Sequence, residues 1–166
     1  MILKKNTLTK KHVILIVDDD TTNLQVIGSF LYNKNYKIIL AKSGKDALKS
    51  IEKNLPDLIL LDIMMPEMNG YEVCEKIKDD DQTMDIPIIF LTAKTEAKDI
   101  IKGFNTGGVD YVTKPFIKEE LLARIKTHIS LKVSQDLLKE QAKKLEKANK
   151  IILESVQKFG NIFRDR

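Results

Sequence analysis

Short apolar runs alternate with amphipathic stretches between residues 13 and 130 of the chain. The apolar runs are rich in Val, Ile and Leu with little polar alternation, which is typical of strands covered on both faces. Strands that alternate with helices in this way predict an α/β fold built around a parallel sheet. Five strands are expected, at Val13–Val17, Tyr36–Leu40, Asp57–Leu61, Pro87–Leu91 and Val109–Val112.

The stretches between these strands have the spacing of helices with one apolar face. They lie near residues 22–33, 43–53, 69–79 and 95–104, and a fifth begins near residue 118. Asp20, Thr21 or Thr22 can cap the first helix, and Ser43 precedes the second. All four prolines fall at predicted boundaries, where a missing backbone donor is tolerated, so none interrupts a helix.

After Leu131 the pattern changes to one long helix with no glycine or proline before Gly160. Its a and d positions form a heptad seam, which comprises Leu131, Gln135, Leu138, Ala142, Leu145, Asn149, Ile152, Val156 and Phe159. A helix over residues 131–159 extends about 44 Å, too far for one small domain to cover, so a partner helix is expected. Asn149 at an a position favours a two-stranded coiled coil and hence a homodimer. The alternative is a lone helix folded back on the domain, because Gln135 and Ala142 make the seam thin.

The chain has 166 residues, of which 43% are hydrophobic and 31% charged, as suits one globular domain with an appendage. We predict a basic extension at 1–12, a domain at 13–130 and a helical tail at 131–166. No apolar run approaches the roughly 18 residues of a membrane span, and the chain does not begin with a secretory signal. A cytoplasmic address is therefore expected. Cys74, the only cysteine, is interpreted as a small buried hydrophobic residue on a helix.

The net charge of +4 is unevenly distributed, with +4 in residues 1–12, −5 in 13–117 and +5 in 118–166. An acidic centre between basic ends argues against a chain that binds nucleic acid along its whole length. The segment after Ile117 continues as one helix without a helix-turn-helix break, so no DNA-binding domain is expected.

Polar groups follow the apolar strands at the points where the strands end. Because functional side chains gather beyond the carboxyl ends of an open parallel sheet, we expect these groups to converge on one edge. Like charges raise one another's pKa, so a cluster of carboxylates is costly without a cation. Mg²⁺ prefers hard oxygen ligands and would remove that cost, with Mn²⁺ as an alternative ion. The group comprises Asp18, Asp19, Asp20, Asp62, Thr92 and Lys114.

Some of these residues also have a purely structural interpretation. Asp20 suits a helix cap, Thr92 alone could end a strand, and Lys114 alone could be a surface charge. Asp62 is harder to explain, because an acid at the end of Leu58–Leu61 is buried at a cost unless a partner offsets it. His12 and His128 have no acid or cysteine near them at ligand spacing, so packed or solvated roles are expected.

Between Val13 and about Ile129 the chain closely resembles the receiver domain of two-component response regulators. The resemblance is carried by the segments Val13–Asp20, Leu60–Gly70, Phe90–Ala93 and Gly107–Phe116, which occur in that order at the predicted strand ends. It implies a (βα)5 fold with flavodoxin-like strand order, which the apolar pattern alone could not establish.

The resemblance also implies roles for individual residues. Asp62 would be the phosphoacceptor, and Asp18 and Asp19 the acidic pair that organises Mg²⁺. The direct ligands would be Asp19, an Asp62 carboxylate oxygen and the Met64 backbone carbonyl. A phosphoryl group would be bound by Lys114 and Thr92, beside the aromatic switch position Tyr111 and a cis bond before Pro115.

The resemblance further implies a signalling mechanism and partners. A histidine kinase or phosphotransfer protein would donate the phosphoryl group, and only self-phosphorylation and self-dephosphorylation would be catalysed. Thr92 would then move inward with Tyr111 behind it, changing the face formed by the fourth helix, fifth strand and fifth helix. One departure is Gly108, where relatives often have alanine, so a looser loop is expected there.

Two other functions are compatible with parts of the sequence. Asp18, Asp20 and Thr22 fit the DxDxT nucleophile motif of haloacid-dehalogenase-like phosphatases, but Glu119 and Glu120 open a helix where that family needs an acidic pair. That hypothesis also leaves Asp62 unexplained. The other alternative is a phosphorylation-independent coiled-coil interaction protein with a vestigial acidic pocket.

Overall fold

The computed structural model describes residues 11–93 and 97–164, with side chains described as far as residue 159. Most of the predicted extension at 1–12 and the start of the helix predicted at 95–104 lie outside the described residues. The chain divides into two compact units between Ser130 and Leu131. The first unit contains five strands and most of the helices, and the second consists of the later turns of the last helix.

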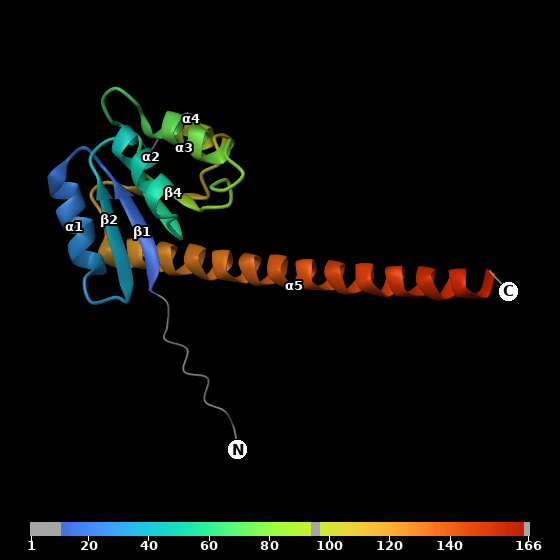
Figure 1. Cartoon of the computed structure of the whole chain (residues 1–166). Helices are drawn as coiled ribbons and strands as arrows, with labels where there is room; N and C mark the ends of the chain where they lie inside the picture. Colours follow the sequence, from blue (N-terminus) through green and yellow to red (C-terminus); the bar gives the residue numbers. More distant parts are fainter. Residues whose placement is uncertain (1–10, 94–96, 165–166) are drawn as a thin grey trace, which may run out of the picture. The chain divides into compact units, whose positions relative to one another are not determined.

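Five parallel strands form one sheet in the first unit (Figure 1). They are β1 (His12–Val17), β2 (Tyr36–Ala41), β3 (Leu58–Asp62), β4 (Ile88–Thr92) and β5 (Asp110–Thr113). The sheet order is β2-β1-β3-β4-β5, so the chain reverses its direction of travel across the sheet after β2. This order confirms the α/β prediction and the flavodoxin-like topology that the resemblance implied.

Helices cover both faces of the sheet, as the continuous apolar strands predicted. They are α1 (Thr21–Leu31), α2 (Gly44–Lys53), α3 (Gly70–Lys78), α4 (Ala97–Asn105) and α5 (Lys118–Arg164). One core cluster joins side chains of α2 and α3 to the sheet, and the other joins α1 and the first turns of α5 to the opposite face. Successive residues of β1 alternate between the clusters, with Leu15 in one and Ile16 in the other.

Local side-chain chemistry explains where the helices begin and end. Asp20 accepts a hydrogen bond from the Thr22 backbone N–H at 2.8 Å and caps α1, as one of the predicted alternatives. Ser43 caps α2 in the same way. The first helix ends two residues earlier than predicted, because Asn33 and Asn35 turn the chain with φ angles of 62° and 45°.

The phenyl ring of Phe90 on β4 occupies the space beside two glycines. A Cβ atom on Gly108 would lie 2.4 Å from Phe90 Cε2, and one on Gly103 would lie 3.1 Å from Phe90 Cδ2. The backbone of the loop before β5 therefore packs directly on an aromatic ring. We expected Gly108 to loosen this loop, but the missing side chain instead permits close packing.

This packing predicts the outcome of restoring the alanine that relatives often carry. Gly108→Ala should destabilise the chain by about 1–3 kcal/mol, because the new methyl group overlaps the Phe90 ring. Phe90→Leu removes the ring, so the double variant should be less destabilised than the sum of the single variants. Urea unfolding of the four proteins measures the coupling. Strictly additive effects would show that Phe90 is not the obstacle.

Candidate functional site

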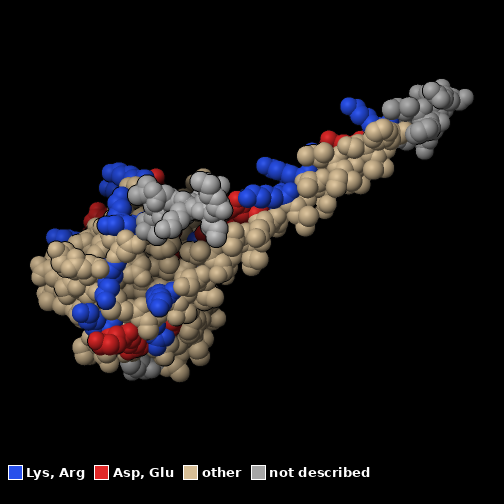
Figure 2. All heavy atoms as spheres, turned by 90° about the horizontal axis from the view of Figure 1, so that it is seen from below, with Lys and Arg blue, Asp and Glu red and all other residues tan. Residues whose placement is uncertain are grey.

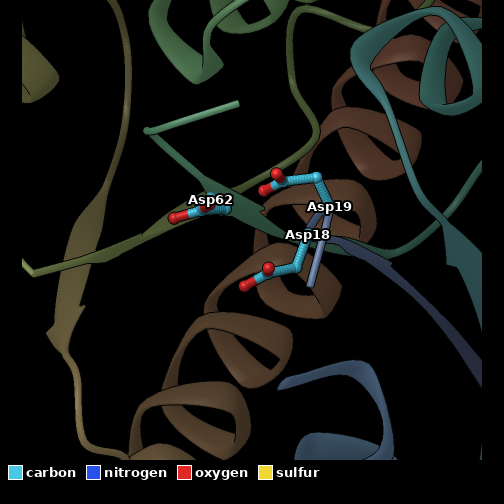
Figure 3. Close-up of side chains that lie close together, drawn as sticks. All are labelled: Asp18, Asp19 and Asp62. Carbon is cyan, nitrogen blue, oxygen red and sulfur yellow. The ribbon is translucent and has the colours of Figure 1, made fainter. Parts of the chain in front are cut away.

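The charged residues predicted at the strand ends come together at the carboxyl edge of the sheet. Asp18 and Asp19 directly follow β1, and Asp62 is the last residue of β3. Each of the three carboxylates offers an oxygen atom that lies within 4.8 Å of the others (Figure 3). The parallel register aligns these strand ends, because Val17 pairs with Leu61 and Asp62 with Leu91.

Lys114 bridges two of these carboxylates from the end of β5. Its Nζ atom donates to Asp18 Oδ2 at 2.8 Å and to Asp62 Oδ1 at 3.0 Å. Asp18 is completely buried and Asp62 almost so, whereas about a fifth of the Lys114 side chain is exposed. One ammonium group therefore neutralises part of the charge of two carboxylates that have little access to water.

The two neighbouring acids Asp18 and Asp19 have different surroundings. Asp18 Oδ1 accepts from the Asp20 backbone N–H at 2.9 Å, and Asp18 Oδ2 accepts from Asn23 Nδ2 at 3.0 Å and from Lys114. Asp19 is exposed and accepts no hydrogen bond from the described part of the chain. Asp19 can therefore offer its oxygens to a cation, while those of Asp18 already have partners.

The charges at the site shift the pKa values of its members. Burial raises the pKa of the Asp62 carboxyl, the Lys114 hydrogen bond lowers it, and the Asp18 charge raises it again, with a net upward result. Burial lowers the pKa of Lys114, but its bonds to Asp18 and Asp62 outweigh this, so that pKa is raised. Lys114 therefore stays charged and donates a hydrogen bond to Asp62, whose carboxyl group is harder to ionise than an ordinary one.

The donor set fits a magnesium ion. Asp19 and Asp62 supply hard carboxylate oxygens, and the Met64 carbonyl accepts no hydrogen bond from the residues that the structure covers. Three clustered carboxylates face a single lysine in the site, so negative charge remains that a divalent cation would offset.

Gly70 is a site residue that the strand-end pattern did not reveal. A Cβ atom on Gly70 would lie 2.3 Å from the backbone oxygen of Asp62, and the Gly70 N–H donates to the Ile63 carbonyl at 2.9 Å. The start of α3 is thus seated against the end of β3. Asn69 caps α3 in a reciprocal capping box with Glu72, and the spacing of these two residues is the sequence signal of this helix start.

Thr92 and Tyr111 line one small pocket between β4, α4 and β5. Thr92 is buried at the end of β4, while Tyr111 is half-buried and packs edge-on against Phe104 at 6.3 Å between ring centroids. The Lys114–Pro115 peptide bond is cis, which is the isomer that the resemblance implies.

Both histidines have acidic partners that are distant in the sequence. His128 Nε2 lies 3.0 Å from Asp110 Oδ2, and His12 Nδ1 lies 3.7 Å from Asp57 Oδ2. Arg124 also donates to both oxygens of Asp110 and carries its guanidinium 5.9 Å from the Tyr111 ring centroid. The packed role expected for His128 therefore includes an ion-pair cluster that joins β5 to α5.

The model of the response regulator receiver domain family matches residues 14–126. The chain belongs to this family. The resemblance seen in the sequence motifs is thereby confirmed, and this receiver domain is a module of two-component response regulators.

Several relatives show the family likeness in sequence and in fold. A probable cyclic di-GMP phosphodiesterase of Vibrio cholerae is 46% identical over 133 residues, which are 80% of this chain and 30% of that protein. The response regulator PleD of Caulobacter vibrioides is 38% identical over 77% of this chain and 28% of its own length. The matched part thus spans less than a third of these two relatives.

Solved structures show the same architecture. A putative response regulator from Chloroflexus aurantiacus superposes with a TM-score of 0.70 at 38% identity, over 73% of this chain and 99% of that one. The receiver domain of the Pseudomonas aeruginosa sensor histidine kinase PA1611 superposes at 0.67 with 32% identity, over 72% and 97%. That structure has a magnesium ion coordinated in its active-site cleft.

The long helix raises the question of a membrane segment. Within the described ranges, no helix has both the length and the apolar character that crossing a bilayer requires.

The raised pKa of Asp62 predicts a pH-dependent gain of stability in Asp62→Asn. Folding favours the protonated form of Asp62, so the wild-type receiver loses stability as the pH rises from the ordinary value of 3.8 through the folded pKa. The uncharged variant avoids this loss. It should be more stable by on the order of 1 kcal/mol at about pH 7, and the difference should narrow toward about pH 4. Urea unfolding without divalent cations measures the difference.

Asp20→Asn is the matched control. The Thr22 backbone N–H lowers the pKa of Asp20, so that carboxylate contributes stability above its ordinary pKa and loses it on acidification. Asparagine caps a helix about as well as aspartate, and this variant should show no gain at neutral pH. A stability difference for Asp62→Asn that does not change with pH would contradict the assignment.

Proposed function

We propose that the receiver domain accepts a phosphoryl group on Asp62 in a Mg²⁺-dependent reaction. The supporting observation is the placement of Asp62 beside Asp19 and under the ammonium group of Lys114, at the edge where parallel strands end. The donor would be a cognate histidine kinase or phosphotransfer protein. The domain would catalyse only its own phosphorylation and dephosphorylation and would otherwise act as a signalling module.

The reaction forms an acyl phosphate. A carboxylate oxygen of Asp62 would attack the phosphorus of the donor's phosphorylated histidine in line. The bond from phosphorus to the histidine nitrogen would break, and the electron pair of that bond would stay on the nitrogen as its ring lone pair. Asp19, Asp62 and the Met64 carbonyl would hold Mg²⁺, which neutralises charge on the phosphoryl oxygens. Lys114 would turn from the carboxylates to a phosphoryl oxygen, and the Thr92 hydroxyl would donate to another.

The switch would act through the pocket shared by Thr92 and Tyr111. Movement of Thr92 toward the phosphoryl group opens space in that pocket, and Tyr111 would follow from its half-buried position. The surface formed by α4, β5 and α5 changes as the ring leaves Phe104.

The second unit would form a coiled-coil homodimer. Every large apolar side chain described in it is exposed, with exposed fractions from 46% to 65%. Figure 2 shows charged side chains, Lys and Arg with some Asp and Glu, along one edge of the later turns of α5, beside a continuous uncharged surface. Burying the seam of one helix against that of a second copy would remove the large apolar side chains of the seam from water. The switch would thereby control dimerisation or a partner.

The structure offers little support for the phosphatase alternative. Its nucleophile would be Asp18, but Asp18 is completely buried and both of its oxygens already accept hydrogen bonds. Its second acid would be Asp20, and that side chain caps α1. The phosphorylation-independent alternative makes a different prediction, because it requires no phosphoryl transfer at all.

Phosphorylation of the full 166-residue chain tests the acceptor. With Mg²⁺ and a small acyl phosphate donor, the wild-type protein should gain one phosphoryl group by intact-mass measurement, and chelation of Mg²⁺ should prevent it. Asp62→Asn should gain none, while Asp18→Asn should still be labelled at Asp62, more slowly. The phosphatase hypothesis instead requires loss of activity in Asp18→Asn and no stable label at either site. A wild-type chain that is never labelled would favour the constitutive interaction protein.

Two adjacent leucines test the coiled coil. Leu138 lies on the seam and Leu137 does not, although both are exposed in the single chain, by 64% and 54%. Leu138→Glu should convert the dimer into a monomer in sedimentation velocity, because a charge would be buried at the interface. Leu137→Glu is the matched control and should leave the dimer intact. Equal effects of the two substitutions, or a monomeric wild type, would refute the seam.

A further inference from the structure

Asn23 contacts the acidic cluster from α1. It is half-buried on the first turn of that helix, and its Nδ2 atom donates to Asp18 Oδ2 at 3.0 Å. Asp18 is completely buried, so its hydrogen-bond donors have to come from the protein itself. Asp18 Oδ2 has two such donors, the neutral amide of Asn23 and the ammonium group of Lys114.

In the proposed reaction Lys114 has to move away from Asp18, whereas Asn23 does not. Lys114 has a long, partly exposed side chain and already divides its ammonium group between Asp18 and Asp62. In the phosphorylated state its Nζ atom would be needed at a phosphoryl oxygen. Asn23 is a short side chain on a helix that the Asp20 cap fixes at its start, so its amide has no comparable freedom.

We propose that Asn23 is a positioning residue that holds the Asp18 carboxylate in place when Lys114 turns to the phosphoryl group. This inference rests on the proposed function. Without Asn23, departure of Lys114 would leave Asp18 Oδ2 as a buried acceptor with no partner, which is unfavourable. A neutral amide also leaves the negative charge of the site undiminished, whereas a second ammonium group would compete with a divalent cation.

The same contact should support cation binding before any phosphoryl group arrives. Asp18 lies within the cluster of carboxylates, so a change in its orientation alters the charge next to Asp19 and Asp62. Loss of a partner that orients such a group typically weakens metal binding by about 10-fold or more. Removal of the Asn23 amide should therefore weaken Mg²⁺ binding in the unphosphorylated chain.

An NMR titration of the full chain with MgCl₂ alone tests this. Asn23→Leu removes the donor at nearly constant size and should raise the Mg²⁺ dissociation constant about 10-fold. Asn23→His restores a ring N–H near the same position and should recover much of the affinity. Gln25→Leu, on an exposed position of the same helix, is the matched control and should bind Mg²⁺ as the wild type does.

The outcomes separate this inference from the function on which it rests. If the wild type does not bind Mg²⁺, the proposed function itself fails. If the wild type and Asn23→Leu bind Mg²⁺ equally well, only the role of Asn23 is overturned. A lower unfolding temperature of Asn23→Leu with unchanged Mg²⁺ affinity would show that Asn23 serves helix stability alone. Should Asn23→Leu not fold, Asn23→Ala removes the same amide without adding apolar bulk and takes its place in the comparison.

Discussion

The bridge from Lys114 to two buried carboxylates depends on the entire layout of the sheet. Lys114 follows β5, Asp62 ends β3 and Asp18 follows β1, and β4 separates β3 from β5 in the sheet. The ammonium group reaches both acids because β1, β3, β4 and β5 run parallel and the carboxyl ends of β1, β3 and β5 lie close together. The register that pairs Thr92 with Thr113 and Asp62 with Leu91 provides this alignment. Apolar residues packed on both faces hold the strands in that register.

The charges at this edge also have a cost for the stability of the fold. Three clustered carboxylates and a single lysine leave an excess of negative charge, and burial makes Asp62 harder to ionise. Such a cluster lowers the stability of the fold relative to a neutral one. The same features favour a divalent cation, which would offset the excess negative charge. The fold is therefore destabilised at this cluster, and binding of a cation there would restore stability.

Features that depend on residues close together in the sequence could be predicted, and features that depend on distant residues could not. Strand and helix positions were predicted within about two residues, because they follow from local apolar spacing and from caps such as Asp20. Asp62 and Lys114 were found because each stands at the end of a strand. The order of the strands came only from the family resemblance, since apolar spacing does not encode which strands are neighbours.

Most of the contacts that the sequence did not predict join residues that are distant along the chain. Asn23 is one polar residue on a helix, and nothing in its spacing shows that it faces Asp18. Gly108 was expected to loosen its loop because relatives often have alanine there, and its contact with the Phe90 ring on β4 joins residues 18 positions apart, so local spacing does not show it. His128 meets Asp110 across 18 residues of chain, and together with Arg124 it ties α5 to the strand that carries Tyr111. Arg124 lies near the Tyr111 ring as well as on Asp110, so a shift of Tyr111 toward Thr92 would change the surroundings of α5 directly. A signal at Asp62 could reach α5 by this route without any further element of the fold.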